Sequence, residues 1–124
     1  MKDLVRVKVL EATKGHSKVT DQPTLTLKLE PLETILLHDE EVGYLFTTIS
    51  DGDNEGTRGW RQAQLRYVLG LDPYYLASEK LMTPEFTKTE LHTILGKEFL
   101  AAIDITNVPD FGEKLRVLDF YRLP

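Results

Sequence analysis

The last thirty residues of the chain constrain its fold most strongly, because they have the pattern of two strands joined by a short loop. Strands are predicted over residues 98–106 and 115–123. The segment between them, residues 107–114, contains a proline and a glycine, which favour turns. Consecutive strands joined by a short loop pair antiparallel. The chain is therefore expected to end in the closing hairpin of a β-rich domain.

The first half of the chain has the same strand character. Residues 4–12 alternate between valines on one side and Arg6 and Lys8 on the other. Residues 24–30 alternate between leucines and polar residues, and residues 44–49 are rich in strand-forming residues. Alternation with period two is typical of a strand that has one face in the core. Three strands are therefore predicted here, the first two with basic or hydroxyl-bearing outer faces.

The segments between these strands are predicted to be turns and loops. Residues 13–21 are polar and suit a hairpin loop. Residues 35–37 form either a short strand or an extension of the second strand, and residues 39–43 are typical of a turn. Residues 50–59 contain three glycines and three acidic residues, a composition that favours a loop.

Two helices are predicted in the second half, where the period changes. In residues 60–69 the apolar side chains fall at helical spacing, and a glycine follows where a C-terminal cap belongs. Residues 87–95 begin with Thr87 and Glu90 at the spacing of a capping box, and a glycine again follows. Residues 72–86, between the two helices, contain two prolines and are expected to be irregular.

The order of these elements predicts the fold class. Three strands come first, then a helical insert, then two more strands, all within one domain over residues 1–124. This order predicts a mainly β protein with a helical insert, arranged as an OB-fold-like five-stranded Greek-key barrel. A β-sandwich and an open sheet packed on helices are the alternatives.

The composition excludes several classes of protein. The absence of cysteine excludes disulfides and thiolate metal sites. No window reaches the ~18 apolar residues of a membrane span, and the N-terminus lacks the apolar run of a signal peptide, so a cytoplasmic protein that does not bind membranes is expected. The formal net charge of −5 argues mildly against binding a polyanion. The charges are segregated, however: residues 1–28 hold six Lys and Arg against three acidic residues, and residues 29–56 hold eight acidic residues and no Lys or Arg.

Sequence patterns for catalysis or for metal binding are weak. Residues 51–56 match the first half of a calcium loop, but the twelfth position is Gln62, which cannot supply the bidentate carboxylate. His16, His38 and His92 are far apart in the sequence and lack ligand spacing, so no zinc site is expected. The chain contains neither the glycine-rich phosphate loop nor the serine nucleophile elbow. We therefore expect no enzymatic activity and no metal or other cofactor.

Several short motifs, taken in order, resemble those of a known family. The motifs are Ser17-Lys18, Leu25-Thr26-Leu27-Lys28-Leu29, Leu69-Gly70-Leu71-Asp72, Leu95-Gly96-Lys97, Phe111-Gly112-Glu113-Lys114 and a final aromatic-x-x-Pro. In this order they resemble small phage-encoded single-stranded-DNA-binding proteins of replication and recombination modules. The resemblance implies an OB-fold that binds single strands with little sequence preference, often as a homo-oligomer. It also implies replication or recombination proteins as partners, in the cytoplasm of the bacterial host.

Binding of a single strand requires cations for the phosphates and aromatic rings on which bases stack. Nine candidate cations lie on the first two strands and their loop, before and at the start of the first helix, and on the last strand: Arg6, Lys8, Lys14, Lys18, Lys28, Arg58, Arg61, Arg116 and Arg122. The candidate stacking residues are Tyr44, Trp60 and Tyr121. Phe46, Phe99 and Phe120 are interpreted as core residues. The alternation of the last strand places Arg116, Phe120 and Arg122 on one side and Tyr121 on the other, and the two arginines are expected near the first strand if the two strands are neighbours. The cations are expected to converge on one concave side of the fold while the carboxylates gather elsewhere.

Two other functions fit the same residues. The chain is alternatively a phage structural or accessory protein-interaction module, in which residues 29–56 form an acidic partner surface. A weaker third interpretation is an inhibitor that mimics nucleic acid with this acidic segment. Lys and Arg on the outer face of a strand also commonly serve solubility alone, an interpretation that applies to Arg6 and Lys8.

Overall fold

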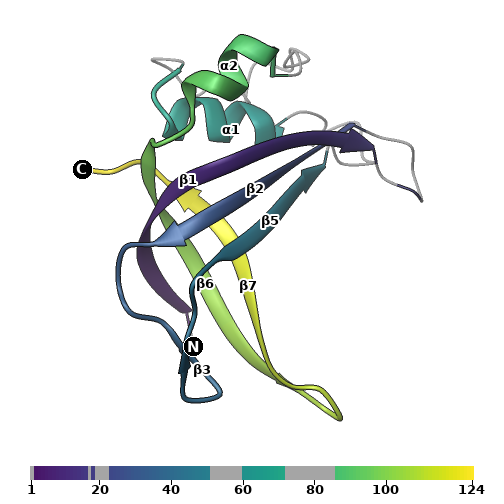
Figure 1. Cartoon of the computed structure of the whole chain (residues 1–124), viewed down its shortest axis with the longest axis vertical. Helices are drawn as coiled ribbons and strands as arrows, with labels where there is room; N and C mark the ends of the chain where they lie inside the picture. The colour runs from purple at the N-terminus through teal and green to yellow at the C-terminus, as the bar shows by residue number, and fades with distance from the viewer. Residues whose placement is uncertain (1, 17, 19–22, 51–59, 72–85) are drawn as a thin grey trace.

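The computed structural model describes residues 2–16, 18, 23–50, 60–71 and 86–124, with the backbone alone for residues 2, 23, 50 and 60–63. Its main element is a five-stranded antiparallel sheet, with strand order β5-β2-β1-β6-β7 (Figure 1). The strands are β1 (Lys2–His16), β2 (Pro23–Pro31), β5 (Leu45–Ser50), β6 (Glu98–Val108) and β7 (Gly112–Tyr121). A small hairpin of β3 (Leu36–Leu37) and β4 (Glu40–Glu41) lies between β2 and β5 in the chain.

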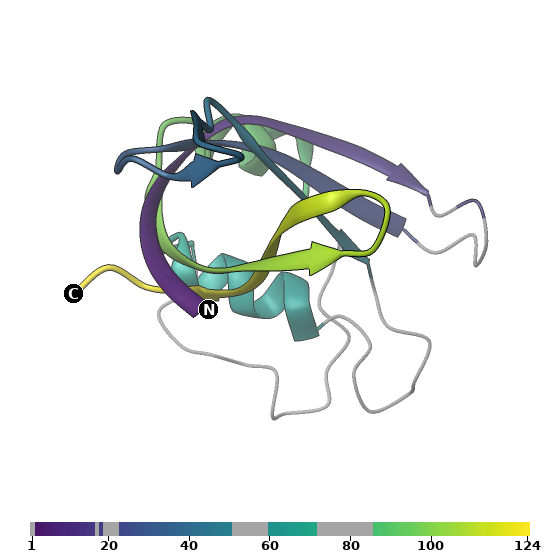
Figure 2. The same cartoon turned by 90° about the horizontal axis from the view of Figure 1, so that it is seen from below.

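The sheet is strongly curved, but hydrogen bonds do not close it into a barrel. Figure 2 shows the curvature from below: β1, in purple, bends around from the side of β6 and β7 to the side of β2. β5 and β7 are the two edges of the sheet and are not paired with each other in the described residues. Helix α1 (Trp60–Val68) lies against both edge strands, β5 and β7. The predicted mainly β fold with a helical insert is therefore confirmed, while the predicted closed barrel is not formed.

The largest differences from the predicted strand boundaries are in β1 and β7. β1 continues to His16, because residues Gly15 and His16 still pair with Thr24 and Pro23 of β2. The predicted hairpin loop over residues 13–21 is therefore wrong for its first four positions, since backbone pairing does not require apolar side chains. β7 runs from Gly112 to Tyr121, which shifts the last strand toward the N-terminus relative to the predicted residues 115–123.

A β-bulge divides β1 into two halves. Val9 pairs with Leu29 and Glu11 pairs with Lys28, so Leu10 is an extra residue in β1. Val5, Val7 and Val9 are buried before the bulge, as their alternation predicts. After the bulge the phase changes, and Ala12 is the residue that packs against the core.

A second bulge in β7 corrects the predicted faces of the last strand. Ala102 pairs with Asp119 and Ile103 pairs with Val117, so β7 has one extra residue between them, Leu118. Phe120 is buried, as predicted, but Arg116 is exposed and lies on the opposite face. The alternation that grouped Arg116 with Phe120 is therefore wrong, because the bulge changes the phase in the middle of the strand.

The two predicted helices are both present, although α2 ends at Thr93 and not at the predicted Leu95. After α1, Gly70 has a φ of 78°, its N–H bonds to Tyr67 and the N–H of Leu71 bonds to the carbonyl of Arg66, which together form a Schellman cap. The short helix α2 (Lys88–Thr93) begins with the predicted capping box, in which Thr87 and Glu90 each accept a backbone hydrogen bond from the other.

A partly buried ion pair joins the two helices. Arg66 of α1 donates to both carboxylate oxygens of Glu90 in α2, and its guanidinium lies 4.4 Å from the centre of the Phe86 ring. The hydrogen bond from Arg66 holds the pKa of Glu90 below its usual range, against an opposing effect of burial. One carboxylate therefore caps α2 and ties it to α1.

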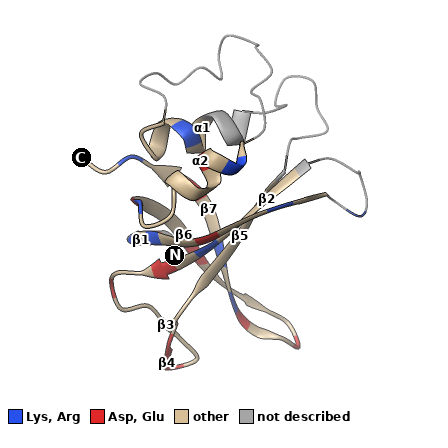
Figure 3. Cartoon of the chain, turned by 45° about the horizontal axis from the view of Figure 1, so that its top comes forward, with Lys and Arg blue, Asp and Glu red and all other residues tan. Residues whose placement is uncertain are grey.

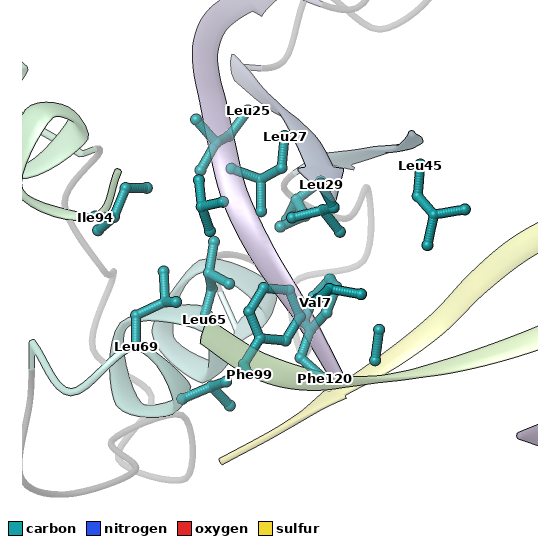
Figure 4. Packing of buried hydrophobic residues seen from close by; sticks show 14 of the residues in the cluster. Val7, Leu25, Leu27, Leu29, Leu45, Leu65, Leu69, Ile94, Phe99 and Phe120 are labelled. Atoms are coloured by element: carbon teal, nitrogen blue, oxygen red, sulfur yellow. The ribbon is translucent and has the colours of Figure 1, made fainter. Parts of the chain in front are cut away.

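The core lies on the inner face of the sheet and beneath both helices. It contains the inward-facing residues of all five strands, among them Leu27 and Leu29, together with Leu65 of α1 and Leu69 just after it (Figure 4). Phe99 packs edge-on against Phe120, with ring centres 5.7 Å apart. The opposite, outer face of the sheet is therefore the face that is available to contact a ligand.

Candidate functional site

The outer face of β2 and β5 carries two exposed aromatic rings beside a lysine. Tyr44, just before β5, is 55% exposed, and Phe46 of β5 is 65% exposed. Lys28 of β2 is the register partner of Phe46, and its Nζ lies 4.3 Å from the centre of the Tyr44 ring. Thr26 and Thr48 also face outward here, with their hydroxyl oxygens 3.0 Å apart. We call these five residues the β2–β5 face.

Hydroxyl side chains extend this face toward the loop between β1 and β2. Thr26 lies opposite Thr13 of β1, and Thr24 lies opposite Gly15. Beyond them, His16 and Lys18 are both exposed. Within the described residues, the part of the outer face from the Thr13–Thr26–Thr48 row to this loop carries no carboxylate. The sequence-predicted cations Lys28 and Lys18 thus flank a polar, uncharged stretch of strand surface.

The predicted cations of β1 lie in a different environment, next to carboxylates. Arg6 forms an ion pair with Glu98 of β6, with Nε and Oε1 2.7 Å apart. Lys8 has Glu30 and Glu98 as register partners on its two sides. Side chains at directly opposed positions of antiparallel strands are close neighbours, so this part of the outer face has alternating charge. The expectation that basic residues converge on one side while carboxylates gather elsewhere is therefore wrong for β1.

The predicted site residues of β7 and the following segment are separate from the β2–β5 face. β6 lies between β7 and β1, so the expected proximity of Arg116 and Arg122 to the first strand is not observed. Arg116 is opposite Asp104, and Tyr121, 47% exposed, is opposite Leu100. The guanidinium of Arg122 lies 5.1 Å from the centre of the Tyr67 ring on the side of α1.

Four further predicted residues can be placed only in part. Lys14, in the second half of β1, is exposed. Trp60 and Arg61 form the start of α1, but their side chains lie outside the described residues, and Arg58 lies outside them altogether. The structure therefore brings Lys28 and Tyr44 together and does not test Trp60 as a stacking residue.

Sequence interpretation missed Phe46, which it assigned to the core. The phase of the strand determines which side chains face inward. Leu45 and Ile49, both at odd-numbered positions, are buried. Phe46 and Thr48 then have to face outward. Phe111, at the tip of the β6–β7 hairpin, is also 83% exposed, and only its place in the predicted loop indicated this.

Carboxylates do gather at one end of the molecule, on the β3–β4 hairpin. Asp39, Glu40 and Glu41 are exposed there, and the acidic residues at the lower hairpin tips are visible in Figure 3. His38, in this hairpin, approaches Glu113 of β7, with Nδ1 and Oε1 4.0 Å apart. Part of the predicted acidic segment 29–56 therefore forms an acidic surface at one end of the molecule. Residues 51–56, which contain the incomplete calcium loop, lie outside the described residues.

The described residues show neither a cluster of metal ligands nor a helix that could span a membrane. Among the residues that the structure describes, no three His, Asp or Glu side chains are grouped so that they could hold a metal ion. In the same residues, no helix has the length and apolar character needed to cross a membrane.

Comparison with known proteins adds no assignment. No protein-family model and no curated protein sequence matches this chain. The functional interpretation therefore depends on the geometry of the β2–β5 face.

Proposed function

We propose that this chain is a non-catalytic single-stranded-DNA-binding protein with an OB-type fold, and that the β2–β5 face is its binding surface. The observation that carries the proposal is the pair of exposed rings, Tyr44 and Phe46, beside Lys28. Base stacking on such rings is tolerant of sequence, because every base has a flat π face. The same proposal includes a role in DNA replication or recombination, with proteins of those processes as partners. It also includes formation of a homo-oligomer.

The arrangement of the strands supports this choice of surface. The sheet order is third-second-first-fourth-fifth when its five strands are counted along the chain, with the helices between the third and the fourth. An OB-fold is a partly open Greek-key barrel that binds oligonucleotides on the face of its second and third strands. In this chain those two strands are β2 and β5, which are the strands that carry the exposed rings.

The charge distribution supports binding that depends on stacking more than on phosphate contacts. Arg6 and Lys8 lie beside carboxylates, so among the residues that the structure describes, Lys28 and the cations near the β1–β2 loop are the ones that remain close to the proposed path. Glu11, the register partner of Lys28, further lowers the positive potential there. Affinity should therefore respond more strongly to loss of a ring than to loss of one lysine.

Alanine substitutions at the two rings test the proposal. We expect Tyr44→Ala and Phe46→Ala each to weaken binding of a fluorescein-labelled oligothymidylate by about tenfold, measured by fluorescence anisotropy, because stacking contributes about 1–3 kcal/mol per base. Tyr121→Ala is the matched control, since Tyr121 is an exposed ring on the outer face that is separated from β2 by β1 and β6. Absence of binding by the unaltered chain at 50 mM salt and tens of micromolar protein would end the proposal, and an equal loss in the control would move the site to β7.

The acidic end supports a second candidate function, a protein-interaction module. Asp39, Glu40 and Glu41 are exposed together on one hairpin, so they could contact a basic partner. Charge reversal distinguishes the two functions, because Lys28→Glu should weaken DNA binding under the first and leave a partner complex intact under the second. Glu40→Lys with Glu41→Lys should have the opposite pair of effects.

A further inference from the structure

A groove lies between α2 and the second half of β1, close to the β2–β5 face. β1 pairs with β6 only from Lys2 to Lys8, so beyond its bulge the edge of β1 that faces away from β2 is not covered by β6. The segment after α2 is fixed there by two hydrogen bonds, from Gly96 N–H to the Val9 carbonyl and from Val9 N–H to the Lys97 carbonyl. Figure 1 shows α2 at this upper end of the sheet. The open groove that results has a volume of about 400 Å³.

One face of the α2 segment forms a wall of this groove. Lys88, Leu91, His92 and Leu95 line it, at the spacing of residues on a single helix face. Lys88 and His92 are exposed, while Leu91 is partly buried against the core. The two leucines therefore form the apolar part of this wall, and Lys88 and His92 form its polar rim.

The opposite wall is the edge of β1 beyond its bulge, which β6 does not cover. Leu10 and Ala12 supply its apolar part, and Glu11 and Thr13 form its rim. Glu11 and Thr13 are the register partners of Lys28 and Thr26, so the groove is one strand away from the β2–β5 face. A polymer that lies across β5 and β2 would reach the groove after crossing β1.

We propose that this groove is a second subsite for the same single strand, a proposal that rests on the function proposed above. The groove would accept a base between the leucines of α2 and the side chains at the β1 bulge, with His92 available to contact it. Lys88 would contact a phosphate on the α2 rim. Glu11 on the opposite rim repels phosphates, so the backbone of the strand would follow α2 and not β1.

The length dependence of binding tests this subsite. Oligothymidylates of six and twenty nucleotides are titrated with the whole chain and with the double variant Lys88→Ala, His92→Ala, because an OB domain covers about 4–16 nucleotides. We expect the double variant to bind the longer oligomer about tenfold more weakly and the shorter one unchanged. Lys114→Ala, an exposed lysine on β7, is the control and should change neither. Circular dichroism verifies that the variants fold.

The other outcomes separate this inference from the proposed function. If the unaltered chain binds both oligomers and the double variant binds them equally well, the groove is not a subsite, while the proposed function stands. An equal loss of affinity for both oligomers also contradicts the subsite. In that case Lys88 and His92 would act only through the general electrostatic potential of the surface. If the unaltered chain binds neither oligomer, the proposed function fails and the subsite fails with it.

Discussion

Phe46 and Phe99 are both strand phenylalanines, yet Phe46 is 65% exposed and Phe99 is completely buried. The difference follows from the phase of each strand, because successive side chains point to opposite faces of a sheet. An exposed aromatic residue contributes little to the core, so the two rings have different roles in stability.

Substitution of these two residues should therefore have opposite effects on stability and binding. Phe99→Ala is expected to lower the free energy of unfolding by about 3–5 kcal/mol, because it leaves a cavity beside Phe120. Phe46→Ala is expected to change it by less than about 0.5 kcal/mol while it weakens oligothymidylate binding. Urea denaturation of both variants measures the first effect, and a large loss of stability in Phe46→Ala would show that this ring belongs to the core.

Among the elements, the helices could be predicted from sequence more accurately than the strands. The capping box of α2 and the glycine cap of α1 are local patterns, and both are confirmed. The two bulges, at Leu10 and Leu118, depend on pairing with distant strands and have no local signal. The predicted faces of the last strand failed for this reason, and the predicted convergence of the strand cations failed because the carboxylates that lie opposite Lys8 and Arg116 come from other strands.

The ion pair between the helices should make stability depend on acid pH. Glu90 has a lowered pKa in the folded chain, so its contribution is complete above the ordinary carboxyl value of 4.5 and is lost as the pH falls through the lower folded value. Glu90→Gln should lose about 2–3 kcal/mol at pH 7, because the buried guanidinium of Arg66 then loses the carboxylate that it contacts in α2. Chemical denaturation between pH 7 and pH 3 measures this, and an equal acid dependence in the variant and the unaltered chain would contradict it.

At the scale of the whole molecule, the net charge of −5 and the paired cations of β1 limit the number of phosphate contacts. A single strand releases about 0.7 counterions per contacted phosphate, so two to four contacts give a slope of about −1.5 to −3 in a plot of log affinity against log salt. Titrations between 50 and 300 mM salt measure the slope. A slope steeper than about −5 would show that many more cations take part than this surface provides.

The alternating charges beside β1 have a consequence for the choice between single-stranded and duplex DNA. A duplex keeps its bases stacked internally and offers a protein mainly its phosphates. Ion-paired side chains such as Arg6 with Glu98 have little attraction left for such a backbone. Discrimination against the double helix would then arise from charge that is already neutralised within the sheet, without any steric barrier.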